Sequence, residues 1–292
     1  MFVRKRISGI VGLCVVGALP IALVAQETNR AEPSRFMRFV QTSESEGHVD
    51  TASTTYSRAD GVRVDLVAAV HIADRRYYQT LDRQFTNYDV VLYEMVKPSD
   101  VHVTSSERSA SPVSALQIGM KKLLGLEFQL DAINYSATNF VHADMDPEMF
   151  FKAQEQNGES LFGLMIRAML SEQMRQATAT NQADGFQMLL ALFSQDSDFK
   201  LKFLLGRQLE TIEGVLADVD QGPAGKGSVL VSGRNQVALR VLSEQIQQGK
   251  RKAAIFYGAG HMGDLEKRLQ EIGFKKVSEE WLTAWDIRKP TR

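Results

Sequence analysis

Cysteine is nearly absent from this chain, because Cys14 is the only one among 292 residues. One thiol cannot form a disulfide within the chain, so disulfides do not hold this fold together. Cys14 lies in the middle of an apolar run behind the bulky Leu13, whereas a lipidation signal has a small residue there. If that run is removed, the chain has no thiol left for chemistry.

An excess of basic residues is also missing. The chain has 34 Lys and Arg against 35 Asp and Glu, which gives a net charge of -1. Nucleic-acid binding needs a clustered basic face, so we expect no nucleic acid among the partners. The glycine-rich loop at 222–228 contains no Gly-Lys-Ser/Thr and precedes a strand-like run instead of following one, which excludes a phosphate-binding loop.

The N-terminus has the pattern of a targeting segment. Three basic residues (Arg4, Lys5 and Arg6) precede residues 7–25, which are apolar and carry no charge. Residues 1–25 therefore predict a secretory signal peptide. Leu23 is bulky for its place before the cleavage site, and 19 apolar residues can just span a bilayer, so an uncleaved N-terminal anchor is the alternative. We expect an exported protein, periplasmic or extracellular, which is anchored to the inner membrane if the segment stays.

The remaining chain predicts one domain behind a polar linker at 26–35. Hydrophobic residues make up 44% of the sequence, which is enough for a sizeable core. Residues 36–292 alternate strand-like and helix-like segments, so we expect a single α/β domain with a mixed, largely parallel central sheet flanked by helices. Strands are expected at 36–40, 53–56, 62–71, 89–96, 229–231, 252–257 and 277–287. In the last strand, one face is expected to carry Val277, Trp281, Trp285 and Ile287. Helices are expected at 75–88, 234–249 and 264–272, the last with Gly273 as its C-terminal stop.

The middle of the chain, at about 146–217, predicts a helical insertion. Asp146 and Pro147 have the residue types of a helix cap and a first helical position. Six of the eleven methionines lie between Met145 and Met188. Methionine fills irregular contacts, which favours an adaptable helical core. A cap over a pocket, or a surface for a peptide or lipid, is the alternative.

Two strand-like runs that lie far apart in the sequence each end near a histidine. His71 closes the apolar run at 62–70, and His261 follows the run at 253–257 through Gly258. Ligands bind at the carboxyl ends of strands in open α/β sheets. We therefore expect the two histidines to meet in one pocket, although 190 positions separate them.

Glu94 stands at the end of another apolar run, at 89–93. A carboxylate there is costly unless it is paired or binds a metal. Two histidines and one carboxylate are a common ligand set for a divalent metal with open positions, so His71, Glu94 and His261 predict a site for manganese, cobalt or zinc. Such a metal would activate water and polarise a carbonyl. The alternatives are a buried arginine beside Glu94 and histidines that serve only as hydrogen-bonded structural residues.

Four further polar residues are candidates for the same site. Arg234, at a predicted helix start, could hold an anionic group or an oxyanion. Asn235 could orient water or substrate, or simply cap the helix. His142 and Asp144 are two positions apart and share a face if the chain is extended. They could lie beside the metal or hydrogen-bond to its ligands, or they could belong to a strand end and a helix cap.

At these positions the chain resembles the TraB/GumN family, which lies in a superfamily with the Tiki metalloproteases, the erythromycin esterases and the ChaN-like haem-binding lipoproteins. The resemblance covers about residues 60–287. One departure is Ala68, which stands where the family motif has glycine. The motif positions are occupied by His71, Glu94, the pair Arg234-Asn235, and Gly258 with His261; residues 140–144 with Pro147 resemble a further family element.

The resemblance implies a hydrolase fold. Tiki members are divalent-metal proteases, whereas the esterase branch uses similar histidine and glutamate residues without an agreed metal. We therefore expect an exported, metal-dependent hydrolase, peptidase- or esterase-like, with a peptide or small-molecule substrate and with membrane contact only through an uncleaved N-terminal segment. The alternative is a non-catalytic protein of the same superfamily that binds haem or another small hydrophobic ligand, with His or Met as an axial ligand.

Overall fold

The computed structural model describes residues 36–97, 124–156, 199–209 and 228–289. These residues belong to one unit, Ala31–Arg292. The predicted signal segment 1–25 and the linker 26–35 lie outside the described residues. Within the described ranges, no helix is long and apolar enough to cross a membrane.

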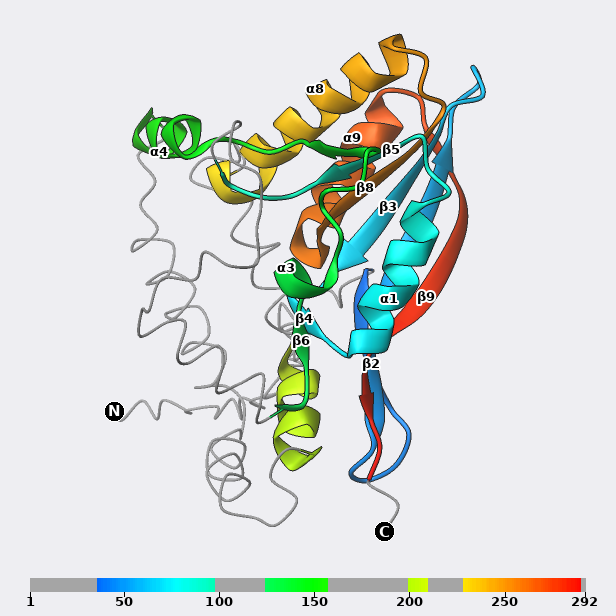
Figure 1. Cartoon of the computed structure of the whole chain (residues 1–292), viewed down its shortest axis with the longest axis vertical. Coiled ribbons are helices and arrows are strands. Elements are labelled where there is room, and N and C mark those ends of the chain that lie inside the picture. The colour runs from blue at the N-terminus through cyan, green and yellow to red at the C-terminus, as the bar shows by residue number, and fades with distance from the viewer. Residues whose placement is uncertain (1–35, 98–123, 157–198, 210–227, 290–292) are drawn as a thin grey trace, which may run out of the picture. The chain divides into compact units, whose positions relative to one another are not determined.

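A seven-stranded mixed sheet forms the centre of the fold (Figure 1), which confirms the predicted α/β class. The strands follow the order β1-β2-β3-β8-β5-β7, and β9 pairs with β2. Pairing is antiparallel around β2 and parallel from β3 to β7. The strands of this sheet are β1 (Met37–Gln41), β2 (Gly47–Ser57), β3 (Arg63–Ala69), β5 (Val90–Tyr93), β7 (Phe140–His142), β8 (Lys252–Gly258) and β9 (Lys275–Ile287). A separate small sheet joins β4 (Ile72–Ala73) and β6 (Glu127–Phe128).

The place of β8 between β3 and β5 matters most for the site. These three strands are parallel, so their carboxyl ends lie at one edge of the sheet. The register pairs Ala69 with Gly258 and Tyr93 with Phe256. The chain segments that follow the three strands therefore begin side by side, although they come from opposite ends of the sequence.

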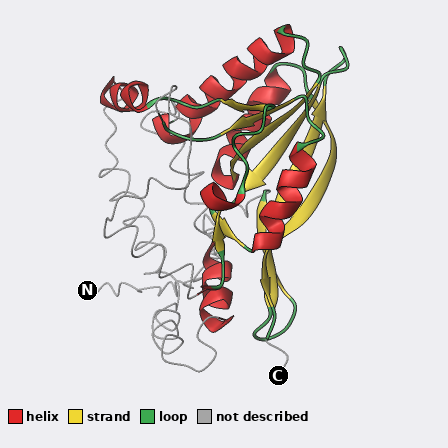
Figure 2. Cartoon of the chain, in the orientation of Figure 1, coloured by secondary structure: helices red, strands yellow, loops and turns green. Residues whose placement is uncertain are grey.

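Helices cover both faces of the sheet (Figure 2). On one face, Tyr77 of α1 contacts Thr51 of β2, with 3.0 Å between the hydroxyl oxygens. On the other face, Tyr56 of the same strand donates to Glu266 of α9 at 2.8 Å. The helices are α1 (Arg75–Phe85), α3 (Gln129–Ala132), α4 (Pro147–Gln156), α8 (Arg234–Gln247) and α9 (Met262–Glu271), with a 3₁₀ turn η3 (Ala259–His261) and a π-helical turn η2 (Val229–Gly233).

The apolar sides of the helices fill the two layers beside the sheet. On α1, Tyr78, Leu81 and Phe85 are buried at helical spacing, and the Phe85 ring lies 4.8 Å from that of Phe256 on β8. On α9, Leu265 and Leu269 are fully buried. The helix ends before Gly273, whose φ of 90° is the left-handed conformation expected of a glycine stop.

The predicted strand at 229–231 is wrong. Residues Val229–Gly233 form the π-helical turn η2, and Ser228 begins it by accepting a hydrogen bond from the Val231 amide at 3.3 Å. A short apolar run looks the same in a buried strand and in a buried helical turn, because periodicity needs more residues than this to show. The turn continues into α8 without a break, and it sets the start of that helix at Arg234.

The predicted shared face of the last strand is wrong for Val277 and Trp281. Trp281 pairs with Ala52 and Trp285 with Val49, and these two residues face opposite sides of β2. Trp285 and Ile287 are buried, but the Val277 side chain is exposed. The pairing of β9 with β2 shifts register between Thr55 and Tyr56, opposite Ser278 and Lys276, so Val277 falls at a β-bulge. An extra residue in one strand reverses the alternation of faces beyond it.

The described part of the predicted insertion is helical. Helix α4 begins at Pro147, and the Asp146 carboxylate accepts from the Met149 amide at 2.7 Å, which confirms the predicted cap. Residues 199–209 are helical as well. The rest of the segment at about 146–217, including most of its methionines, lies outside the described residues.

Candidate functional site

The three predicted metal ligands come together around Gly258, at the carboxyl ends of β3, β5 and β8. A Cβ atom built on Gly258 would lie 3.3 Å from Glu94 Oε2 and 3.8 Å from His71 Nε2. It would lie 3.9 Å from Cδ2 of His261. The space above this glycine is therefore the point where the two histidines and the carboxylate converge.

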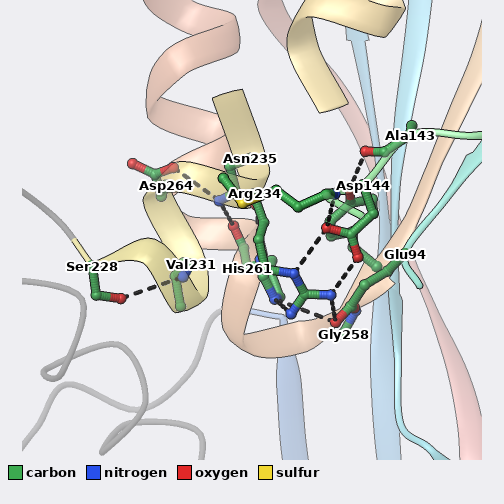
Figure 3. Close-up of polar contacts among 12 residues, drawn as sticks. Glu94, Ala143, Asp144, Ser228, Val231, Arg234, Asn235, Gly258, His261 and Asp264 are labelled. Carbon is green, nitrogen blue, oxygen red and sulfur yellow. Dashed lines mark hydrogen bonds and ion pairs between the residues drawn. The ribbon is translucent and has the colours of Figure 1, made fainter. Parts of the chain in front are cut away.

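Glu94 is held by two N–H donors (Figure 3). Its Oε1 accepts from Arg234 Nη2 at 2.8 Å, and its Oε2 accepts from the Gly258 amide at 2.7 Å. The side chain is only 11% exposed. Burial raises the pKa of Glu94, but its interactions with His261, Arg234 and His71 outweigh burial and hold the pKa well below its usual range. The structure thus shows the alternative of a buried arginine beside Glu94.

Arg234 joins Glu94 to a second carboxylate. Asp144, whose side chain is fully buried, accepts from Arg234 Nε at 2.9 Å and from Nη2 at 2.5 Å. Burial lowers the pKa of Arg234, but the two carboxylates raise it above its ordinary value, so the guanidinium stays charged. With Nε and Nη2 occupied, Nη1 is the nitrogen that faces the site, 3.5 Å from His261 Nε2. Any anion held by Arg234 would have to bind at Nη1.

Asn235 of α8 contacts the His261 ring at Nδ1 and so holds its orientation. The histidine Nδ1 lies 2.8 Å from Asn235 Oδ1, and Nε2 lies 3.5 Å from Glu94 Oε1. Asn235 is completely buried, and its Nδ2 donates to the His261 carbonyl oxygen at 3.0 Å and to Asp264 Oδ2 at 2.8 Å. Asn235 does not cap α8, because the preceding π-helical turn leaves no free helix end there.

The other two histidine predictions have different outcomes. His71 is exposed at the end of β3, and its ring points to the convergence point above Gly258. The His142 ring instead has Nε2 2.6 Å from the carbonyl oxygen of Met95, the residue after Glu94. His142 thus holds the main chain beside Glu94, while Asp144, two positions on, contacts the site through Arg234.

Sequence reasoning missed three residues that support the site. Asp264 accepts from Asn235 and from Arg268 Nε, the latter at 2.6 Å. Tyr257 donates to the Ala143 carbonyl at 2.5 Å, next to Asp144, and burial raises the pKa of its hydroxyl well above the usual value. Asp264 and Arg268 are four apart on a helix, the spacing of a surface ion pair, so their sequence pattern gave no sign of a site.

The residue types at the convergence point suit a divalent metal, but their arrangement does not. Both oxygens of Glu94 already accept N–H groups, and the cation beside it is Arg234. Within the ranges that the structure describes, no group of three His, Cys, Asp or Glu residues has the geometry to hold a metal ion. We therefore derive no step through a metal, and the divalent metal stays a prediction.

Comparison of the chain with models of known protein families, with curated proteins and with solved structures found no match. The resemblance to the TraB/GumN family therefore rests on the residues at its motif positions.

Proposed function

We propose that this chain is an exported hydrolase that cleaves a peptide or ester bond at the convergence point above Gly258. The observation that supports the proposal is the meeting of His71, Glu94 and His261 at the ends of three adjacent parallel strands. Ligand sites of open α/β sheets lie at such strand ends. The signal-like segment 1–25 supports export, and the motif resemblance supports the TraB/GumN family.

In this proposal His261 is the base that takes a proton from the attacking water. Its Nε2 faces the site, and the Glu94 carboxylate 3.5 Å away stabilises the positive charge that the ring gains. Glu94 itself is a poor base, because the donors and cations around it hold its pKa well below its usual range. In this proposal His261 therefore accepts the proton, and Glu94 stays ionised and stabilises the charge on His261.

Two further groups complete the proposed reaction. Nη1 of Arg234, which makes no carboxylate contact within the described residues, donates to the oxyanion that forms when water attacks a carbonyl. His71 is exposed and its Nε2 lies beside the convergence point, so its ring can give a proton to the leaving group. His71 must therefore carry that proton at the start of the reaction. After the products leave, His261 releases its proton to solvent and His71 takes one from solvent, so both rings return to their starting state.

Hydrolysis of a panel of chromogenic esters and fluorogenic peptides by the full chain tests the proposal. We expect Glu94→Gln and His261→Asn to lower kcat about 100-fold or more, since each removes a group from the acid–base set. His48→Asn is the matched control, because the His48 ring pairs with Asp50 at 2.7 Å instead. A wild-type rate equal to that of buffer across the panel, or an unchanged rate in His261→Asn, would overturn the proposal.

Gly258→Ala tests the position of the site. Its φ of -53° and ψ of 143° suit alanine, so the fold should persist, but the methyl group would occupy the convergence point. We expect kcat/KM to fall about 100-fold, the scale of a small misplacement at a reacting centre. Gly263→Ala on α9 is the control, because a Cβ there meets no atom within 4 Å.

The same preparations test the predicted metal. If the metal prediction holds, elemental analysis and melting temperatures with added manganese, cobalt or zinc show binding that His261→Asn abolishes. Metal binding would require Glu94 to turn away from Arg234 Nη2. No bound metal and no change in melting temperature would reject the metal prediction while leaving the acid–base proposal standing.

A further inference from the structure

The buried amide of Asn235 has two chemically different ends, and each end meets a fixed partner. One end lies 3.0 Å from the His261 carbonyl oxygen and 2.8 Å from Asp264 Oδ2. The other lies 2.8 Å from His261 Nδ1. Because Asn235 is completely buried, water cannot replace any of these partners.

The first pair of partners determines which way the amide points. A backbone carbonyl only accepts hydrogen bonds, and so does a carboxylate such as Asp264, which is paired with Arg268 at 2.6 Å. The amide NH₂ must therefore face them. The reversed amide would place its oxygen against two acceptors and leave buried groups unsatisfied, which is costly. Asp264 thus fixes the Asn235 oxygen toward His261 Nδ1 (Figure 3).

The amide oxygen in turn determines where the His261 proton lies. An amide oxygen only accepts, so His261 Nδ1 must carry a hydrogen to make the 2.8 Å contact. We infer that Asp264, acting through Asn235, holds neutral His261 in the Nδ1–H tautomer and so leaves the lone pair on Nε2. Asp264 is a positioning residue, since it acts on the ring only through Asn235.

The contacts of Nε2 do not decide the tautomer, because a donor, Arg234 Nη1, and an acceptor, Glu94 Oε1, each lie 3.5 Å from it. The shorter contact of Nδ1 with the Asn235 oxygen decides it. The opposite tautomer would set two lone pairs against each other across the Nδ1–Oδ1 contact. The catalytic meaning of the inference rests on the proposed function, because only a base or a ligand uses that lone pair. The tautomer itself does not depend on it.

Long-range ¹H–¹⁵N correlation NMR of the full chain with ¹⁵N-labelled histidine tests the inference. The spectra are recorded at the alkaline end of a pH series, where a further rise in pH no longer changes the ring signals. We expect the His261 signals, assigned with His261→Asn, to show a protonated Nδ1 and a bare Nε2. Asn235→Ala should shift the ring toward the Nε2–H tautomer that free imidazole favours in water. His142, which contacts the Met95 carbonyl instead, should keep its signals in every folded variant.

A pair of variants at Asp264 separates positioning from packing. Asp264→Asn can still accept from Asn235 through its amide oxygen, so it should keep the tautomer. Asp264→Ala removes one of the two acceptors that orient the amide, so part of the ring population should change to the Nε2–H form, and kcat/KM should fall about 10- to 100-fold if the chain is a hydrolase. An Nε2–H ring in the wild type, or one tautomer in all folded variants, would overturn the inference. An Nδ1–H ring in a protein without hydrolysis would reject only the proposed function.

Discussion

At the scale of single residues, Arg234 controls the electrostatics of the candidate site. One guanidinium contacts two carboxylates of low exposure, Glu94 and Asp144, and approaches His261. Arginine suits this place better than lysine, because its planar fork donates to both carboxylates at once. The sequence predicted a cation beside Glu94, either a metal ion or, as the alternative, a buried arginine. The structure places a positive side chain there, 140 positions away along the chain.

Removing Arg234 should destabilise the fold, because two carboxylates of low exposure would lose their positive partner. We expect Arg234→Met to lower the free energy of unfolding by about 3–5 kcal/mol, because Glu94 and Asp144 lose their counter-charge. The double variant Arg234→Met/Asp144→Asn should lose less free energy of unfolding than the two single variants lose together, by about 1–3 kcal/mol. Urea denaturation measures all four proteins.

The control for this cycle is a surface ion pair of similar geometry. Arg240 and Glu244 on α8 lie 3.1 Å apart and are both exposed. Arg240→Met should change the free energy of unfolding by about 0.5 kcal/mol or less. If the losses of unfolding free energy in the two single variants added up to the loss in the double variant, Arg234 and Asp144 would not stabilise each other. Arg234 would then not be the counter-charge of Asp144.

At the scale of elements, the sequence predicted the parallel strands well and the irregular turns poorly. The run at 252–257 is confirmed as β8, because continuous apolar residues mark a strand covered on both faces. The predictions at Val229 and Val277 were wrong for local reasons. A π-helical turn and a β-bulge each add a residue to a regular repeat. Such insertions leave no mark in a sequence pattern of period two or 3.6.

The same limit applies to the site. His71, Glu94 and His261 could be found because each follows a strand, and parallel strands end at one edge. The link from Asp264 through Asn235 to His261 could not be found, because it joins side chains of two helices and a turn, and no spacing rule relates residues so placed. Side-chain pairing across elements depends on packing that the sequence does not display.

The end of α9 offers an element-scale prediction with a matched control in the same helix. Gly273 has a φ of 90°, and a Cβ there would meet no atom within 4 Å, so Gly273→Ala tests backbone strain alone. We expect it to lower the free energy of unfolding by about 1 kcal/mol. Gly263→Ala, with helical backbone and equal space, should be neutral or stabilise the protein by up to about 0.5 kcal/mol. Thermal and urea unfolding distinguish the two signs; equal effects would contradict this explanation.

At the scale of the whole molecule, contacts at both ends of the strands join segments that lie far apart in the sequence. At the carboxyl edge, the Lys202 ammonium donates to Asp74 Oδ1 at 2.7 Å, and the Asp286 amide donates to Asp74 Oδ2 at 2.6 Å. At the amino edge, Asp89 Oδ2 accepts from the amides of Arg251 and Lys252 at 2.8 and 2.9 Å. These carboxylates connect segments of distant sequence, and for Asp89 the contact should weaken in acid.

The pKa of Asp89 predicts how its contribution to stability changes with pH. The amides of Arg251 and Lys252 hold the pKa of Asp89 below its usual range, so its contribution is present above the unfolded pKa of about 3.9 and lost as the pH falls through the folded pKa. Asp89→Asn should lower the free energy of unfolding by about 1 kcal/mol at neutral pH, since exposure weakens a charged hydrogen bond. The difference from wild type should be constant from about pH 8 to 5 and shrink below about pH 4. Urea denaturation across this range measures it, with Glu271→Gln, at the exposed end of α9, as the control for the change in net charge. A difference that grew in acid would mean that the folded pKa of Asp89 is raised.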